Sequence, residues 1–173
     1  MFNKYDFSSI HSDYLTPPEL VASILKSNGL VQFDCDTCCS QNNIPANFRY
    51  KIDGLYLNSG NKISDKNGLV GTWFPHNWCN PPFESCKAFV QKAVEEQKKG
   101  HTTYMLIPAR TETKYWHEYI LDDFGGTNRS DVRVEFLKKG VCFLAPENAE
   151  RMPVFKNGLA IVTFVGHLEG SNA

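Results

Sequence analysis

The tetrapeptide Asn80-Pro81-Pro82-Phe83 constrains the fold of this chain more than any other segment. Two consecutive prolines cannot continue a β-strand, because each lacks a backbone N–H and fixes φ. The tetrapeptide follows a short apolar and aromatic stretch at 73–79 and precedes an amphipathic segment. We therefore predict a stiff turn at the carboxyl end of a strand, which is where open α/β sheets bind ligands.

Strand and helix patterns alternate along most of the chain. Short apolar runs bounded by glycine, proline or asparagine predict strands, and apolar residues at helical spacing predict helices. Besides a helix that opens near Pro17, the pattern predicts helices at 84–99 and 112–121 and strands at 30–33, 48–52, 102–107, 132–136, 141–143 and 159–165. This alternation predicts an α/β fold with a mostly parallel sheet, and the late strands without a helix between them predict a C-terminal antiparallel pair.

The segment Thr16-Pro17-Pro18-Glu19 predicts the start of a helix. Thr16 is expected at the N-cap, Pro17 at the first helical position, and Glu19 at the position that completes a capping box. The helix is expected to end at Asn28-Gly29, because glycine readily adopts the left-handed conformation that follows many helices. Thr16 and Pro17 therefore have a structural explanation beside any functional one.

Two acidic residues, Asp34 and Asp36, follow the predicted strand at 30–33. Asn80 follows another predicted strand, and the carboxyl ends of parallel strands meet at one edge of a sheet. We therefore expect these three side chains near one ligand site. Both acids also suit a turn cap, and that alternative stays open.

An asparagine carbonyl, a backbone carbonyl held by two prolines and an aromatic face together suit the binding of a planar amine. Residues 80–83 match the signature of methyltransferases that act on planar amino groups. The Thr-Pro-Pro-Glu opening, the Asp-rich strand end, residues 80–83 and the segment 106–113 succeed one another as in the phage-encoded DNA N6-adenine methyltransferase (Dam) family. The chain resembles that family over residues 14–165, and its motif order is similar to that of gamma-class adenine methyltransferases.

The resemblance implies roles for the residues of the turn. Asn80 and the backbone carbonyl of Pro81 accept hydrogen bonds from the N6 amino group, Pro82 belongs to the same catalytic motif, and Phe83 stacks on the flipped adenine. Two acceptors outside the ring plane stabilise the positive charge that develops on the nitrogen as it attacks a methyl group. Further along the chain, the resemblance implies that Arg110 and Thr111 contact the substrate. Both residues would also suit the cap of the helix that follows.

S-adenosyl-L-methionine is the cofactor that the resemblance implies, and a Rossmann-like methyltransferase sheet is the implied fold. Asp34 or Asp36 takes the acid position that faces the methionine amino group. Thr16 and Pro17 match the segment that touches the cofactor from the other side. The glycine-rich turn of the family is replaced here by Thr-Cys-Cys-Ser at 37–40, where small side chains still allow close approach of the backbone.

The implied reaction is methyl transfer to the N6 amino group of adenine in double-stranded DNA. The implied source is a phage or prophage, which would use the mark against host restriction. Two alternatives stay open. The same chemistry serves other acceptors, namely cytosine N4, RNA and protein glutamine. The altered turn at 37–40 also motivates a non-catalytic binding protein with a degenerate methyltransferase fold.

At 173 residues the chain has the length of one domain. Residues 1–13 are predicted to form an N-terminal arm, and residues 14–173 a single methyltransferase domain without a separate target-recognition domain. The sequence contains no apolar run of the ~18–20 residues that a membrane-spanning helix needs, and its start lacks the pattern of a signal peptide. We therefore expect no membrane partner and a cytoplasmic protein, in the host cell if a phage encodes it.

The formal net charge of −1 indicates no global attraction to nucleic acid, although a local basic patch would suffice. Five cations could form an edge that faces the DNA phosphates, or they could be scattered charges in solvent, namely Arg129, Arg133, Lys138, Lys139 and Arg151. Cys35 and Cys38 have half of a zinc-site spacing, but no second such pair completes it. We therefore expect the six cysteines to be reduced, buried thiols and expect no metal.

Overall fold

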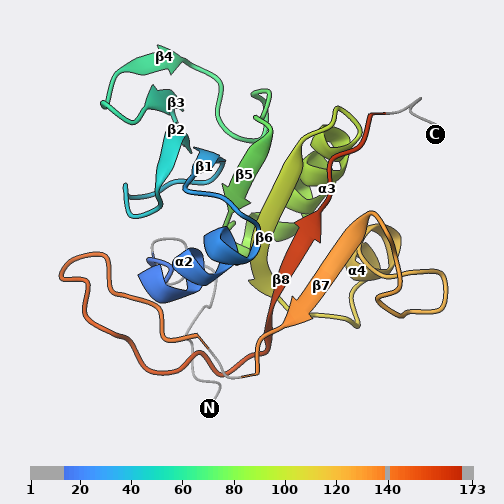
Figure 1. Cartoon of the computed structure of the whole chain (residues 1–173). Coiled ribbons are helices and arrows are strands. Elements are labelled where there is room, and N and C mark those ends of the chain that lie inside the picture. Colours follow the sequence, from blue (N-terminus) through green and yellow to red (C-terminus); the bar gives the residue numbers. More distant parts are fainter. Residues whose placement is uncertain (1–13, 139–140, 169–173) are drawn as a thin grey trace.

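The computed structural model describes residues 14–138 and 141–168, which build one eight-stranded sheet with helices on both faces (Figure 1). The predicted N-terminal arm, residues 1–13, lies outside the described residues. Along the sheet the strand order is β4-β3-β2-β1-β5-β6-β8-β7. The strands are β1 (Phe33–Asp36), β2 (Ala46–Lys51), β3 (Gly54–Leu57), β4 (Lys62–Ser64), β5 (His76–Cys79), β6 (Thr102–Pro108), β7 (Val132–Phe136) and β8 (Leu159–Phe164). The helices are α2 (Pro18–Ser27), α3 (Cys86–Gln97), α4 (Lys114–Tyr119) and the short 3-10 helix η1 (Phe83–Ser85).

The centre of the sheet is parallel and both of its sides are antiparallel. Strands β2, β1, β5 and β6 run parallel to one another. Strands β3 and β4 extend the sheet beyond β2 as an antiparallel hairpin, and β8 is antiparallel to both β6 and β7. The α/β class and the late antiparallel pair are confirmed. The prediction of a mostly parallel sheet is wrong, because the described sheet is mixed.

The hairpin explains this correction. After β2 the chain turns back at Asp53-Gly54, and a Cβ on Gly54 would lie 2.2 Å from the backbone oxygen of Ser64 in β4. Only glycine lets these two backbones approach so closely. The turn signal at this point was visible in the sequence, but the pairing of three short strands was not.

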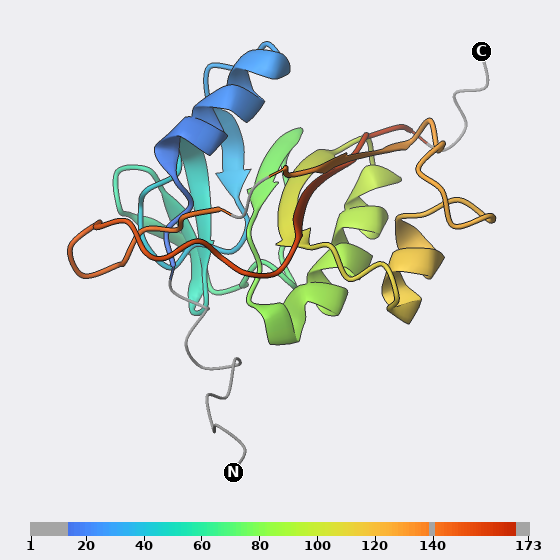
Figure 2. The same cartoon turned by 90° about the horizontal axis from the view of Figure 1, so that it is seen from below.

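Side chains alternate between two cores on the two faces of the sheet. On β6, Met105 and Ile107 pack into the core below α3 and α4, whereas Tyr104 and Leu106 pack into the core below α2. Figure 2 shows α2 on one face and α3 and α4 on the other. All six residues of β8 are buried, which fits a strand with neighbours on both sides.

Two predicted strands differ from the structure in ways that matter for the site. The first strand starts at Phe33, and Val31, predicted within it, is 93% exposed. Asp34 and Asp36 therefore lie within β1 instead of beyond its end. The predicted strand at 141–143 is a loop: Val141 and Phe143 are buried, but pairing is limited to isolated bridges of Leu144.

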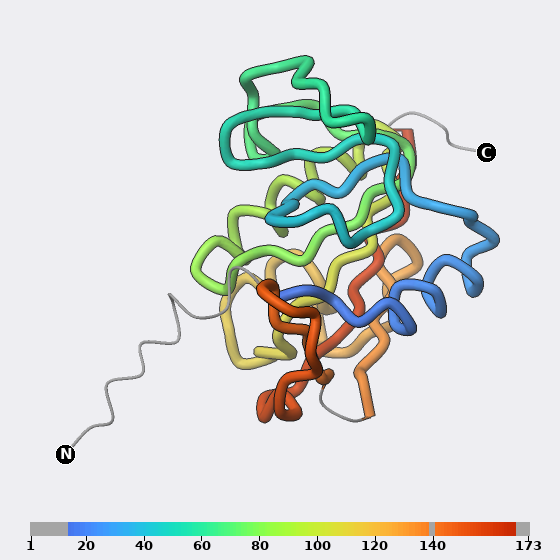
Figure 3. The backbone as a smooth tube through the Cα atoms, turned by 90° about the vertical axis from the view of Figure 1, so that its left-hand side faces the viewer, coloured from blue at the N-terminus to red at the C-terminus, as the bar shows by residue number. Residues whose placement is uncertain are grey.

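The long segment 141–158 between β7 and β8 crosses the sheet at the carboxyl ends of its parallel strands (Figure 1). Leu144 exchanges two backbone hydrogen bonds of 2.9 Å with Leu15. Figure 3 shows the start of the described chain beside this segment. The residues around Thr16 are thereby held at the carboxyl edge of the sheet.

Candidate functional site

The tetrapeptide at 80–83 leaves the carboxyl end of β5, as predicted. β5 ends at Cys79, Pro81 is buried, and Pro82 precedes η1 with an extended backbone at φ −54° and ψ 141°. The backbone N–H of Ser85 donates to the carbonyl of Pro82 at 3.0 Å. The two prolines thus set a stiff corner between β5 and α3, with Asn80 at its start and Phe83 at its end.

Asn80 contacts a residue 64 positions earlier in the chain. Its Nδ2 donates to the Oγ1 of Thr16, with 3.2 Å between the two atoms, and Thr16 is buried. The expected N-cap role of Thr16 is wrong: helix α2 begins at Pro18, Pro17 is its N-cap, and no side chain caps it. Thr16 lies one residue too early to cap, so its hydroxyl is available to Asn80. Glu19 pairs with Arg151 instead of completing a capping box.

The two predicted acids have different partners. Asp34 accepts a 2.9 Å hydrogen bond from the backbone N–H of His76, the first residue of β5, and is held near the amino end of that strand. Asp36 is the last residue of β1 and is paired with Trp78, two residues before Asn80. The structure therefore places Asp36, and not Asp34, at the edge that carries Asn80.

The carboxyl group of Asp36 is buried and has few partners. Burial raises its pKa to about 7, although a hydrogen bond from the backbone N–H of Cys38 and the nearby Arg49 guanidinium oppose the shift. A buried carboxyl group with a raised pKa at a ligand edge is a typical feature of binding and catalytic sites. A cationic group of a ligand beside Asp36 would supply the ion-pair partner that its carboxylate lacks among the described residues.

The turn that follows Asp36 is built into the sheet. Both the backbone N–H and the hydroxyl of Thr37 donate to the carbonyl of Trp78, at 2.9 and 3.0 Å. Burial raises the pKa of Cys39 to about 12, so this thiol stays protonated at neutral pH. In the ranges 14–138 and 141–168, no group of three or more His, Cys, Asp or Glu side chains is arranged to hold a metal ion.

A cleft of about 1010 Å³ opens on the other side of the tetrapeptide, between η1, the segment after β6 and the residues just before β8. Phe83 and Arg110, both predicted site residues, line it together with Lys87 and Lys156. Arg110 is exposed and pairs with Glu112 at 3.1 Å. Thr111 is also exposed but does not line this cleft.

Sequence reasoning missed the contribution of the segment 141–158 to this cleft. The ring of Phe155 lies 5.5 Å from that of Phe83 between centroids, and Phe155 in turn meets Phe143 edge-on at 5.8 Å. Lys156, next to Phe155, lines the cleft. Two aromatic residues in a segment otherwise rich in polar residues and proline were the available signal.

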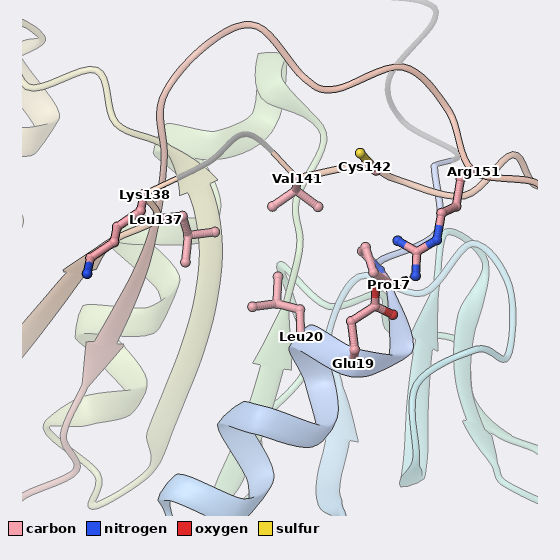
Figure 4. Close-up of a pocket in the computed structure, with 8 residues that line it drawn as sticks. All are labelled: Pro17, Glu19, Leu20, Leu137, Lys138, Val141, Cys142 and Arg151. Atoms are coloured by element: carbon pink, nitrogen blue, oxygen red, sulfur yellow. Dashed lines mark hydrogen bonds and ion pairs between the residues drawn. The ribbon is translucent and has the colours of Figure 1, made fainter.

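A second, smaller cavity of about 370 Å³ lies between the first turn of α2 and the chain on either side of residues 139–140 (Figure 4). Pro17 and Leu20 form one wall and Val141 the other, and Figure 4 shows Glu19 and Arg151 meeting at one end, beside Pro17. The ion pair between these two side chains ties α2 to the segment 141–158.

The described cations of the proposed phosphate-facing edge do not gather at one place. Arg129 pairs with Asp131, Arg133 donates to the side chain of Asn28, and Lys138 and Arg151 line the smaller cavity. Lys139 lies outside the described residues. Scattered charge is therefore the better description of this set.

These features define a class of protein. An α/β sheet whose carboxyl edge carries an Asn-Pro-Pro-aromatic corner, with a buried acid on one side and an open cleft on the other, is consistent with a methyltransferase-like fold. No helix among the described residues is long and apolar enough to cross a membrane.

The family comparison names the class more narrowly. Residues 8–140 match the family described as DNA N-6-adenine-methyltransferase (Dam), and the chain belongs to this family of enzymes. A search among curated proteins found no match. Adenine in DNA is accordingly the substrate that the family implies.

Proposed function

We propose that this protein transfers the methyl group of S-adenosylmethionine to the N6 amino group of adenine in double-stranded DNA, on a Rossmann-like sheet. The observation that carries the proposal is the position of Asn80. It starts a proline-fixed corner at the carboxyl edge, between the buried Asp36 and the cleft that Phe83 lines. Asn80, the proposed hydrogen-bond acceptor for the amine, thus lies between Asp36, which would bind a cation, and the cleft, which would hold the base.

On the acceptor side, the Oδ1 of Asn80 and the backbone carbonyl of Pro81 would accept hydrogen bonds from the two N–H groups of the adenine amine, and one of these protons would pass to solvent once the methyl group is attached. The amine lone pair is then directed away from the ring, and both oxygens stabilise the positive charge that forms on nitrogen during attack. The ring of Phe83 would stack on the flipped base. This stacking offsets part of the free energy that is lost when the base leaves the duplex. Arg110, which lines the same cleft, would contact the neighbouring phosphates.

On the donor side, the residues around Asp36 fit the cofactor. S-adenosylmethionine supplies an electrophilic methyl group on a sulfonium, and it carries a methionine ammonium group. Asp36 is a buried carboxyl group without a cationic side chain bonded to it among the described residues, so an ammonium group would suit it. We assign the acid role to Asp36 because Asp34 is already bonded to His76. The resemblance to the family assigns Pro17 a contact with the cofactor from the side of α2.

The experiment that tests the proposal is transfer of labelled methyl from S-adenosylmethionine to unmethylated plasmid DNA, with RNA and a protein extract as parallel acceptors. Label recovered from DNA as N6-methyladenine is the expected result. Label as N4-methylcytosine, or in RNA or protein glutamine, would keep the chemistry and overturn the substrate. A folded protein that neither transfers label nor binds cofactor by calorimetry would overturn the enzyme.

Asn80→Ala is the matched variant for this experiment. It removes one of the two acceptors for the amine, so we expect transfer to fall by at least ~10²-fold while calorimetric affinity for the cofactor stays within about twofold. Asn61→Ala, in the exposed loop between β3 and β4, is the control and should keep full turnover. Normal turnover by Asn80→Ala would contradict the mechanism.

The biological setting that we propose follows the same resemblance. A phage or prophage gene, active in the host cytoplasm, would mark phage DNA against restriction. A single domain spanning 14–173 would carry the reaction, with target reading by loops at the carboxyl edge. Restriction of phage DNA in a host that lacks the gene, compared with a host that expresses it, tests this setting.

A further inference from the structure

The contact between Thr16 and Asn80 joins the start of the described chain to the centre of the proposed site. Thr16 is held on both sides: Leu15 pairs with Leu144, and the carbonyl of Thr16 accepts a hydrogen bond from the side chain of Asn43 at 3.4 Å. Pro17 restricts Thr16 further, because a residue before proline avoids the helical conformation. The hydroxyl of Thr16 is therefore held in one position, where it contacts the side chain of Asn80.

The orientation of an asparagine amide decides whether it accepts or donates. Rotation by 180° exchanges its carbonyl oxygen and its NH2 group, which have similar size and opposite hydrogen-bonding character. In the structure the Nδ2 of Asn80 donates to the Oγ1 of Thr16. Within 14–138 and 141–168, no residue donates a hydrogen bond to the Oδ1 of Asn80. The bond to Thr16 thus occupies the NH2 group and leaves the carbonyl for a ligand.

We propose that Thr16 is a positioning residue, which holds the amide of Asn80 with its carbonyl oxygen toward the adenine amine. This inference rests on the proposed function. With the amide reversed, its NH2 group would face the NH2 group of adenine, and two sets of donors would meet without an acceptor. The hydroxyl of Thr16 accepts a hydrogen bond from the NH2 group of Asn80 and so holds the amide in the orientation that the structure shows. The role differs from helix capping and from contact with the cofactor.

Thr16→Val tests the role, because valine keeps the shape of threonine and removes the hydroxyl. We expect kcat for methyl transfer to fall about 10- to 100-fold, while the KM for DNA and the calorimetric affinity for S-adenosylmethionine change by less than about twofold. Thr16→Ser keeps the hydroxyl and should restore most of kcat. A Thr16→Val variant with weaker cofactor binding and normal kcat would overturn the inference in favour of a cofactor contact.

Thr103→Val is the matched control. Thr103 is a fully buried threonine on β6 whose hydroxyl has no hydrogen-bond partner among the described residues. Loss of this hydroxyl should leave kcat unchanged. An equal loss of kcat in Thr103→Val and Thr16→Val would mean that any buried Thr→Val change disturbs the sheet, and it would overturn a specific role for Thr16.

A measurement that needs no turnover separates this inference from the proposed function. In nitrogen-15 NMR spectra, the side-chain NH2 signals of Asn80 are identified by their absence in Asn80→Asp. In the wild-type protein one of these protons should exchange slowly with solvent, and Thr16→Val should shift the signals and accelerate the exchange. Fast exchange of both protons in the wild type would overturn the inference even if Thr16→Val failed to fold.

The two failures have different signatures. A wild-type protein that transfers no methyl group, yet shows the protected Asn80 proton, would overturn the proposed function and with it the catalytic part of this inference. A wild-type protein that methylates DNA, together with a Thr16→Val variant of unchanged kcat, would overturn the inference alone.

Discussion

Asp36 shows how one buried side chain links stability to ligand binding. Burial raises its pKa from the usual aspartate value of about 4 to about 7 in the folded protein. An unfolded chain therefore loses the proton from Asp36 at lower pH than the folded protein does. Ionisation of the folded form is unfavourable, so Asp36 reduces the free energy of unfolding progressively as the pH rises from about 4 to about 7.

This sign can be measured by urea unfolding of the ligand-free protein at pH 5 and pH 8. Relative to Asp36→Asn, the wild type should lose on the order of 2–3 kcal/mol of unfolding free energy between these pH values, since one pKa unit corresponds to about 1.4 kcal/mol. Asp65→Asn changes an exposed acid in the same chain and should follow the wild type. A parallel course of the wild type and Asp36→Asn would contradict the raised pKa.

At the residue scale, the sequence was a good guide to which side chains lie at the candidate site. It was a poorer guide to the partners of these side chains. Asn80 and Phe83 were recognisable because prolines constrain their neighbours locally. The role of Thr16 was misassigned, because capping rules consider residues within one helical turn, whereas its partner Asn80 is 64 positions away. Asp34 and Asp36 could not be separated until the register of β1 against β5 was known.

At the scale of elements, the loop before β5 supports the turn after β1. Gly68 lies so close to that turn that a Cβ at this position would be 2.0 Å from the carbonyl oxygen of Thr37. The neighbour is backbone, so it cannot rotate away as a side chain could. The proposed cofactor turn and the loop at 65–75 therefore form one packed unit.

Gly68→Ala should displace this unit. We expect a loss of about 2–3 kcal/mol of unfolding free energy, as for other forced overpacking, together with a loss of cofactor affinity of at least about tenfold. Gly60→Ala is the control: its φ of +93° is strained, but a Cβ there meets no described atom within 4 Å. It should cost about 1 kcal/mol and leave cofactor affinity unchanged. Calorimetry and urea unfolding on both variants decide the matter.

Among the elements, those with strong periodicity were predictable. Strand β7 lies where strict alternation placed it, and β8 matches its apolar run to within one residue. The segment 141–158 was not predictable, because Val141 and Phe143 are buried by contact with α2 and with Phe155 and not by pairing in the sheet. The local pattern of apolar residues indicates that a side chain is buried, but it does not indicate which neighbouring element buries it.

At the scale of the whole molecule, the protein itself has a formal net charge of −1, yet its substrate, DNA, is a polyanion. Attraction must therefore come from a local group of cations. The large cleft is lined by three cations, namely Lys87, Arg110 and Lys156, and by two acids, Glu84 and Glu112. Arg110 pairs with Glu112, so Lys87 and Lys156 carry the excess positive charge. Their position around Phe83 would place positive charge next to the phosphates of a flipped nucleotide.

Lys156→Ala and Lys87→Ala test this electrostatic description. Each should weaken binding to unmethylated DNA about equally for all sequences and reduce the slope of log affinity against log salt by about 1, as loss of one phosphate contact does. Lys62→Ala, at the distant edge strand β4, should leave the slope unchanged. Equal salt slopes for all three variants and the wild type, in fluorescence anisotropy titrations, would place the DNA elsewhere.

The position of β8 between β6 and β7 has a consequence for synthesis of the protein. Ribosomes make the chain from residue 1 onward, yet residues 159–164 fill an interior place in the sheet. Until they emerge, β6 and β7 each present an unpaired edge, and such edges invite association with other chains. Nascent chains should therefore depend on chaperones for longer than a protein whose last strand lies at the border of its sheet.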